Sequence, residues 1–268
     1  MKKRLVALLL ICVMLSALFC GCAPKTEEPK EYIGIISAMD NEIDLLLKEA
    51  VIDRVDTVAG VGYHVGSLRG QPVVITRAGI GKIRASSGVT TMLIQYPISK
   101  VIFTGIAGGV ADEPQVLDEV IATNLVEHDY GILSNDGFTW RSGDPGFGGE
   151  PGAYYDCDPQ LVQLAYDAAV EVVGEKHVFK GTIATGDQFI ANSAYVQKLR
   201  SDYDAYACEM EGAAAAVVCI NYKTPFVVIR ALSDKADGNA HESYENFGDV
   251  AADNSSRIVL KMLDGLGK

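Results

Sequence analysis

The stretch VVIRALSD, Val227–Asp234, is an almost continuous run of apolar residues that ends on an acid. Such a run is typical of a strand buried on both faces of a sheet. Three other segments have a similar arrangement: Ile33–Glu42 (IGIISAMDNE), Phe103–Gly109 (FTGIAGG) and Ala207–Gly212 (ACEMEG). Because ligands collect at the carboxyl ends of strands in open α/β sheets, we expect these segments to surround one small molecule.

Strands and helices alternate along the rest of the chain. Apolar periodicity predicts strands at 32–37, 60–68, 71–76, 101–104, 119–126, 180–184 and 225–232. It predicts helices at 41–50, 83–95, 159–173, 194–199, 211–221 and 245–263. Asp40 or Asn41 is expected to cap the first helix. This alternation indicates an α/β layer sandwich.

One segment departs from this regularity. Gly131–Asp156 is rich in Gly, Asp, Pro and Tyr and contains the only tryptophan, Trp140. A long irregular stretch is usually a functional loop or lid, so we expect that role here.

The N-terminal segment has the pattern of an export signal. Basic residues in Met1–Arg4 precede the apolar run Leu5–Phe19. That run is shorter than the roughly 20 residues that a membrane-spanning helix needs, and it is typical of a bacterial secretory signal. The following FCGC resembles a lipobox, in which Cys22 would be acylated; an uncleaved anchor is the alternative.

We therefore predict three parts: a lipoprotein signal peptide and lipobox at 1–22, a polar tether at 23–31 and a folded domain at 32–268. The protein is expected to be exported and lipid-anchored to the bacterial cell membrane.

Composition excludes several classes of function. The net charge of −12 argues against nucleic-acid binding, which requires a basic face. Outside the leader there are three cysteines, Cys157, Cys208 and Cys219, without CxxC spacing. The sequence therefore predicts neither a disulfide framework nor a zinc site.

Four acids stand near expected strand ends: Glu42 follows the first strand, Asp234 follows the last, and Glu209 and Glu211 flank Met210 at a strand-to-helix junction. Each has an ordinary explanation as a helix cap or as an acid in the first turn of a helix. Together, at the ends of different strands, they predict a carboxylate cluster. Glycosidic bond hydrolysis uses one carboxylic acid at the leaving group and one carboxylate on a water molecule, so this chemistry is favoured.

The two glycine loops are less specific. AGIGK (78–82) and TGIAGG (104–109) lack the spacing of dinucleotide-binding loops and P-loops. Either loop can bring backbone N–H groups to a ligand or form a tight turn.

Read in order, these motifs resemble the 5′-methylthioadenosine/S-adenosylhomocysteine nucleosidases of the nucleoside phosphorylase superfamily. The resemblance rests on AMDNE (38–42), AGIGK (78–82), TGIAGG (104–109), TGDQFI (185–190), EMEG (209–212) and VVIRALSD (227–234). It covers about residues 32–264. It implies a three-layer sandwich with a central mixed β-sheet flanked by helices, a homodimer, and no metal or organic cofactor. The implied reaction hydrolyses the N-glycosidic bond of adenine nucleosides and releases adenine.

The resemblance also implies roles for the acids. Glu42 would activate water for attack on the anomeric carbon, and Asp234 would protonate N7 of the departing adenine. Glu211 would accept hydrogen bonds from the ribose hydroxyls, with Met210 packing on the sugar and Glu209 in support.

Further residues follow from the same resemblance. Phe189 would stack on the purine, and the Ile190 backbone would bind its edge. Arg230 and Ser233 would hold the Asp234 region in place, and Tyr244 would contact the 5′-alkylthio group.

The glycine loop Ile106, Ala107 and Gly108 is also expected to contact the nucleoside. Ile106 stands where the family commonly has serine, and the 131–156 segment is longer than its counterpart in relatives. Both departures leave the preferred 5′ substituent open.

Two alternatives remain at this stage. A phosphate-dependent nucleoside phosphorylase is kept open by Arg77, Lys82 and Arg84 near the first glycine loop, although Glu42 would repel phosphate. A non-catalytic nucleoside-binding lipoprotein would also explain the lipobox and the tether.

Overall fold

The computed structural model describes residues 31–141 and 153–266. The predicted signal peptide, Cys22 and all but the last residue of the tether lie outside these residues and stay predictions. Within the described residues, no helix has both the length and the apolar character needed to cross a membrane.

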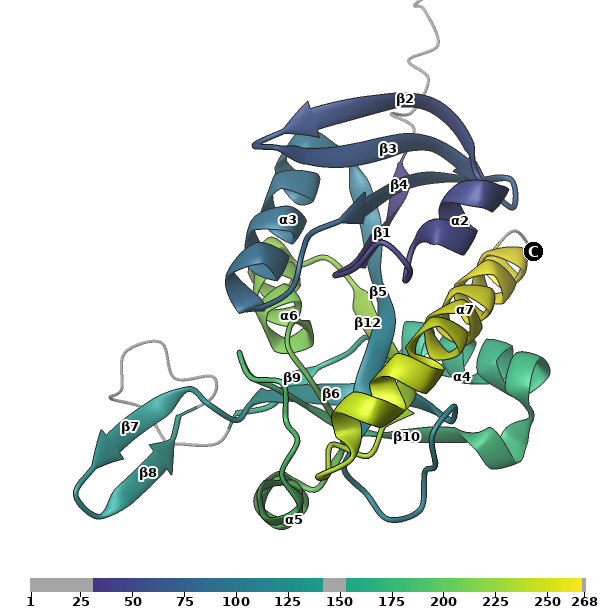
Figure 1. Cartoon of the computed structure of the whole chain (residues 1–268). Helices are drawn as coiled ribbons and strands as arrows, with labels where there is room; N and C mark the ends of the chain where they lie inside the picture. Colours follow the sequence, from purple (N-terminus) through teal and green to yellow (C-terminus); the bar gives the residue numbers. More distant parts are fainter. Residues whose placement is uncertain (1–30, 142–152, 267–268) are drawn as a thin grey trace, which may run out of the picture. The chain divides into compact units, whose positions relative to one another are not determined.

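A mixed sheet of ten strands forms the centre of the described domain (Figure 1). Its order is β11 (Ala205–Glu209), β10 (Val178–Thr185), β6 (Glu119–Glu127), β12 (Phe226–Asp234), β5 (Ile98–Gly109), β1 (Tyr32–Ser37), β4 (Gln71–Arg77), β3 (Val61–Leu68) and β2 (Val51–Val58), with the short β9 (Tyr155–Asp156) beside β6. Strands β4, β1, β5 and β12 run parallel, so their carboxyl ends share one edge.

The sheet also closes partly on itself. Strand β11 pairs with the end of β5 in antiparallel register, with Ala207 opposite Gly109 and Cys208 opposite Gly108. The TGIAGG stretch, expected to be a glycine loop, is therefore the end of strand β5. The pairing brings the EMEG segment to it, a contact that the strand pattern alone did not indicate.

Helices cover both faces of the sheet (Figure 1). Helices α3 (Lys82–Gln95) and α6 (Gly212–Tyr222) pack together on one face, and α4 (Pro159–Val173) and α7 (Ala240–Leu266) pack together on the other. Helix α2 (Asp44–Glu49) contacts α7, and α5 (Ser193–Tyr203) contacts β10 and β11. The predicted three-layer sandwich with a central mixed sheet is confirmed.

Local sequence explains several of these elements. Every residue of β12 is buried, as its continuous apolar run predicts. Helix α6 is rich in alanine, and residues such as Ala213, Ala216 and Cys219 are fully buried. Helix α4 begins with Asp158 as its N-cap, whose carboxylate accepts hydrogen bonds from two backbone N–H groups of the first turn.

The first predicted helix is shorter than expected, and its predicted cap is wrong. Helix α2 begins at Asp44, and the residue at its N-cap is Ile43 without a side-chain cap. The backbone carbonyl of Asp40 instead accepts the N–H groups of Ile43 and Asp44 in a turn, while its carboxylate pairs with Arg77.

The prediction of an irregular segment at 131–156 is wrong for residues 131–140, and its part at 142–152 lies outside the described residues. Strands β7 (Gly131–Ser134) and β8 (Gly137–Trp140) form a two-stranded hairpin that extends from the body of the domain (Figure 1). Asn135 and Asp136 lie between the strands, a position that suits tight hairpin turns.

Candidate active site

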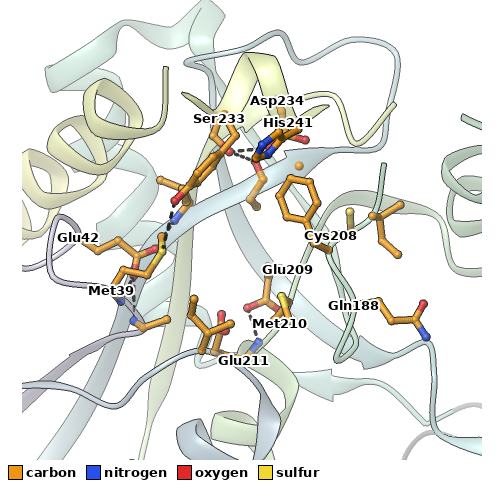
Figure 2. Close-up of a pocket in the computed structure, with 18 residues that line it drawn as sticks. Met39, Glu42, Gln188, Cys208, Glu209, Met210, Glu211, Ser233, Asp234 and His241 are labelled. Atoms are coloured by element: carbon orange, nitrogen blue, oxygen red, sulfur yellow. Dashed lines mark hydrogen bonds between the residues drawn. The ribbon is translucent and has the colours of Figure 1, made fainter. Parts of the chain in front are cut away.

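A cavity of about 280 Å³ opens where the strands and loops of the quoted motifs end (Figure 2). It is lined by all but one of the predicted catalytic and substrate-binding residues: Glu42, Ile106, Ala107, Gly108, Phe189, Ile190, Glu209, Met210, Glu211, Ser233, Asp234 and Tyr244. Figure 2 shows Met39 and Glu42 on one side of this cavity and Asp234 with His241 on another. The remaining predicted residue, Arg230, lies buried behind the lining.

Glu42 is held in a fixed position by backbone amides. Its Oε2 accepts hydrogen bonds from the N–H groups of Ala38 (2.9 Å) and Met39 (2.8 Å), and its Oε1 accepts one from Ile106 (2.9 Å). Burial raises the pKa of this carboxyl, and the positive charge of Arg230 and these amides partly offset the increase. The result is a buried, preorganised carboxyl group beside the end of β5.

Gly105 is essential to this geometry. A Cβ at this position would overlap both Arg230 Nη1 and Glu42 Oε1. The bare Cα therefore lets a buried cation approach the predicted base from the middle of β12. Arg230 also stacks over the ring of Phe103, with 4.8 Å between the guanidinium carbon and the ring centroid.

Arg230 is anchored by the EMEG motif. Its Nη2 donates to Glu209 Oε2 and lies 3.3 Å from Glu211 Oε2. Glu209 also accepts the hydroxyl of Thr185 and the N–H groups of Glu211 (3.1 Å) and Gly212 (2.8 Å). Glu209 therefore accepts the backbone N–H groups at the start of α6 and also orients Arg230. These contacts agree with the supporting role that was expected for Glu209.

Glu211 faces the cavity with one carboxylate oxygen tied to the first glycine loop. Its Oε1 accepts the N–H of Gly81 at 2.8 Å. Burial raises the pKa of Glu211 to about 7, against the lowering effect of Arg230. Gly81 itself has φ of +97°, a conformation that favours glycine.

Asp234 lies at the end of β12 and is also buried. The Ser233 hydroxyl donates to its Oδ2 and the Ala236 N–H donates to its Oδ1, each at 2.7 Å. Burial raises the pKa of Asp234, so the protonated acid is more populated than in water. A Cβ on Gly108 would lie 2.9 Å from Asp234 Oδ1, which explains a glycine there.

Two aromatic residues meet at the cavity. Phe189, from the loop after β10, and Tyr244, from α7, make an edge-to-face contact with 6.2 Å between ring centroids. Tyr244 also places its hydroxyl 3.7 Å from the sulfur of Met39. Phe189 is 52% exposed, so its ring is available to cover a ligand.

Several residues of the site were not predicted from the sequence. The lining includes Ala38, Met39, Ile80, Gln188, Cys208 and His241. Four of these residues, Ala38, Met39, Ile80 and Gln188, lie inside the motifs AMDNE, AGIGK and TGDQFI. The sequence therefore indicated their neighbourhood, although it did not single them out. The cysteine spacing gave Cys208 no predicted role, and His241 follows β12 without a pattern that marks it.

The described residues hold no cluster of three or more His, Cys, Asp and Glu side chains that could bind a metal ion. Cys157, Cys208 and Cys219 are free thiols and buried, and burial raises the pKa of each. Their reactivity as thiolates is correspondingly low.

Comparisons with known proteins agree with this arrangement. The model of the phosphorylase superfamily matches residues 32–264. The chain is 40% identical over 240 residues to a 5′-methylthioadenosine/S-adenosylhomocysteine nucleosidase of Anoxybacillus flavithermus, covering 88% of this chain and 99% of the relative. It is 38% identical over 234 residues to that of Bacillus subtilis, covering 86% and 97%. A crystal structure of the Helicobacter pylori nucleosidase superimposes with a TM-score of 0.78 at 30% identity, covering 89% of this chain and 100% of that one.

Proposed function

The chain belongs to the 5′-methylthioadenosine/S-adenosylhomocysteine nucleosidase family of the phosphorylase superfamily, and we propose that it hydrolyses the N-glycosidic bond of these or related adenine nucleosides. The products would be adenine and a ribose derivative. One observation carries this proposal: two buried carboxyls, Glu42 after β1 and Asp234 at the end of β12, line a single cavity.

Asp234 acts at the leaving group. Its raised pKa favours the form that carries a proton, which it donates to N7 of the purine as the bond to the sugar breaks. The hydroxyl of Ser233 and the N–H of Ala236 then stabilise the carboxylate that remains.

Glu42 acts on the nucleophile. Its carboxylate accepts a proton from a water molecule while the water oxygen bonds to the anomeric carbon. The transition state resembles an oxocarbenium ion, and the carboxylates of Glu42 and Glu211 give the cavity the charge that stabilises it. The three backbone amides keep Glu42 in place during this step.

The other residues bind the substrate. Glu211 accepts hydrogen bonds from the ribose hydroxyls, and Met210 packs on the sugar with Glu209 in support.

Phe189 stacks on the purine, and the backbone of Ile190 binds the edge of the base. Ile106, Ala107 and Gly108 of β5 line the sugar site. Ser233 holds Asp234, whereas Arg230, which was expected to hold the Asp234 region, binds Glu209 and Glu211 instead. Tyr244 packs against the 5′ substituent.

The arrangement favours water over phosphate as the nucleophile. The N–H groups of Ala38, Met39 and Ile106, which could otherwise bind an anion, already donate to Glu42. Lys82 is paired with Asp129 (2.6 Å) and Glu127 (3.4 Å). At the place of the nucleophile beside Glu42, a phosphate ion would meet occupied donors and a carboxylate.

Adenine release from 5′-methylthioadenosine, measured with and without inorganic phosphate, tests this proposal. We expect equal rates and free methylthioribose in both buffers. A requirement for phosphate with a sugar 1-phosphate as product would identify a phosphorylase. Tight nucleoside binding without adenine release would identify a binding lipoprotein.

We further infer a homodimer. Ile83 on α3 is 81% exposed and Ile220 on α6 is 46% exposed, and both line one surface hollow with Ala214, Val217 and Val218. Exposed apolar surface of this kind is typical of subunit interfaces. The N-terminus of α6 carries Glu211, so a partner here would lie close to the active site. Light scattering coupled to gel filtration should show a dimer, and Ile83→Asp should shift it towards the monomer.

The proposal of export and lipid anchoring rests on the N-terminal sequence pattern. The family model begins at residue 32, so the basic and apolar leader precedes the matched region. Membrane fractionation of bacteria that express the full chain tests it. The wild type should carry a labelled fatty acid and sediment with membranes, whereas Cys22→Ser should carry no label; an unlabelled wild type that sediments with membranes would identify the uncleaved anchor.

A further inference from the structure

A second cavity, here called the outer cavity, continues from the active site. The two cavities share Ala38, Met39 and Ile80. Beyond these shared walls, the second cavity is lined by Asp40, Arg77, Gly79 and Arg84, three of them charged. The proposed mechanism does not use these three side chains.

Arg84 is held across the loop that separates the two cavities. Gly79 has φ of +97°, and a Cβ there would lie 2.7 Å from Arg84 Cδ, so the arginine stem packs directly on the glycine backbone. Its Nη1 donates to the carbonyl oxygen of Ile80 at 3.0 Å. These contacts keep a guanidinium next to Ile80, which is one of the shared walls.

Arg77 supplies a second cation at the same place. Its Nε lies 2.8 Å from Asp40 Oδ1, and the two side chains are 50% and 77% exposed. An exposed ion pair of this kind contributes little to stability, so either group can turn to a charged ligand. The outer cavity therefore presents two guanidinium groups and one carboxylate side by side.

The orientation of the nucleoside decides what reaches this cavity. Asp234 marks the purine end of the active site, whereas Glu42 and Glu211 mark the sugar. Met39 and Tyr244 contact each other on the sugar side, and Met39 is also a wall of the outer cavity. A substituent on the 5′ carbon therefore leaves the active site past Met39 and Ile80.

We propose that the outer cavity binds the charged end of a 5′ substituent, with Arg77 and Arg84 recognising a carboxylate. The amino-acid end of S-adenosylhomocysteine has this chemistry: its carboxylate suits the two arginines and its ammonium suits Asp40. 5′-Methylthioadenosine ends before this cavity and gains nothing from it. The inference rests on the proposed function, because it assigns the specificity of the same site.

The test compares kcat/KM for three substrates in the wild type, Arg77→Gln, Arg84→Gln and the double variant. The substrates are S-adenosylhomocysteine, 5′-methylthioadenosine and 5′-butylthioadenosine, whose longer tail is uncharged. We expect each single variant to lower the ratio of S-adenosylhomocysteine to methylthioadenosine roughly 3- to 10-fold, and the double variant more. The ratio of butylthioadenosine to methylthioadenosine should not change. Arg257→Gln, which removes an exposed arginine of α7, is the matched control and should leave all ratios unchanged.

The outcomes separate the two proposals. If the wild type cleaves methylthioadenosine and the double variant keeps the wild-type ratio for S-adenosylhomocysteine, the outer cavity does not bind the carboxylate. An equal loss for butylthioadenosine would also contradict recognition of charge. If the wild type cleaves none of the three nucleosides, the proposed function fails and this inference fails with it.

Discussion

The carboxylate of Glu42 and the guanidinium of Arg230 both approach the Cα of Gly105, where no side chain separates them. Arg230 comes from the middle of β12 and Glu42 from the turn after β1. Burial raises the pKa of Glu42, and the positive charge of Arg230 opposes part of that increase. The absence of a side chain at Gly105 leaves room for both charged groups.

Gly105→Ala tests this relationship. We expect kcat/KM to fall at least about 100-fold and the melting temperature to fall, because the new methyl group overlaps both charged groups. Gly238→Ala is the control, since a Cβ at Gly238 meets nothing within 4 Å. Near wild-type activity of Gly105→Ala would show that the approach of Arg230 to Glu42 has no role.

Asp234→Asn removes the proposed acid and keeps its shape. The Asn carbonyl can still accept the N–H of Ala236, so the fold should be retained. We expect kcat for 5′-methylthioadenosine to fall about 10²- to 10⁴-fold. Asp253→Asn, which changes a partly exposed acid of α7, should leave kcat unchanged. A folded Asp234→Asn enzyme with wild-type kcat would remove this residue from the mechanism.

Glu42→Gln should affect both activity and stability. Three N–H groups point at the two carboxylate oxygens, so the amide NH₂ of glutamine faces a donor in either orientation. We expect kcat to fall about 10²- to 10⁴-fold and the free energy of unfolding to fall by about 1–3 kcal/mol. Steady-state kinetics and thermal unfolding measure the two effects separately. Unchanged kcat would refute the role of Glu42 as the base.

The acid side of the pH profile should report Glu211, together with Glu42, whose pKa burial also raises. Burial raises the pKa of Glu211 to about 7, and the protonated carboxyl has lost a site that accepts a ribose hydroxyl. As the pH falls below about 7, kcat/KM for 5′-methylthioadenosine should therefore fall, approaching tenfold per pH unit. An acid limb that begins only near pH 4.5 would contradict this account of Glu211.

Glu119 provides a prediction about stability outside the active site. It is fully buried on β6, and neither carboxylate oxygen has a hydrogen-bond partner among the described residues. Burial, with a smaller effect of Asp118, raises its pKa well above the ordinary range. The native protein thus keeps a proton that the unfolded chain loses near pH ~4.3. The contribution of Glu119 to stability is complete below that pH, and it is lost as the pH rises towards the pKa of Glu119 in the folded protein.

Glu119→Gln should therefore raise the free energy of unfolding at pH 7.5 by about 1–3 kcal/mol, with a gain that shrinks towards pH 4.5. Denaturant unfolding at several pH values measures it. Glu113→Gln, at an exposed position of the preceding loop, should change little. A gain that does not depend on pH would contradict this explanation.

The sequence predicted the elements whose own residues determine them. The apolar run of β12, the alanine-rich α6 and the capped α4 all lie where their patterns placed them. Strand β2 was not predicted because it lies at the sheet edge and all of its residues are exposed or only partly buried, so the apolar signal is weak. The hairpin of β7 and β8 was not predicted because its strands are short and mostly exposed.

The site residues were found through the order of their motifs, whereas their contacts depend on the fold. Glu42 was expected in the first turn of a helix, but it lies before α2, and its carboxylate turns back to the amides of Ala38 and Met39. The link from Thr185 through Glu209 to Arg230 joins three strands. No local pattern encodes such a link, because it depends on strand order and on the closure of β11 onto β5.

A crystal structure of Asp234→Asn with 5′-methylthioadenosine bound is the most direct test of the central claim. The account predicts one nucleoside in this cavity, with purine N7 at hydrogen-bond distance from residue 234 and the anomeric carbon facing Glu42. A nucleoside bound elsewhere, or with residues 42 and 234 too far apart to contact its two sides, would contradict the proposed mechanism.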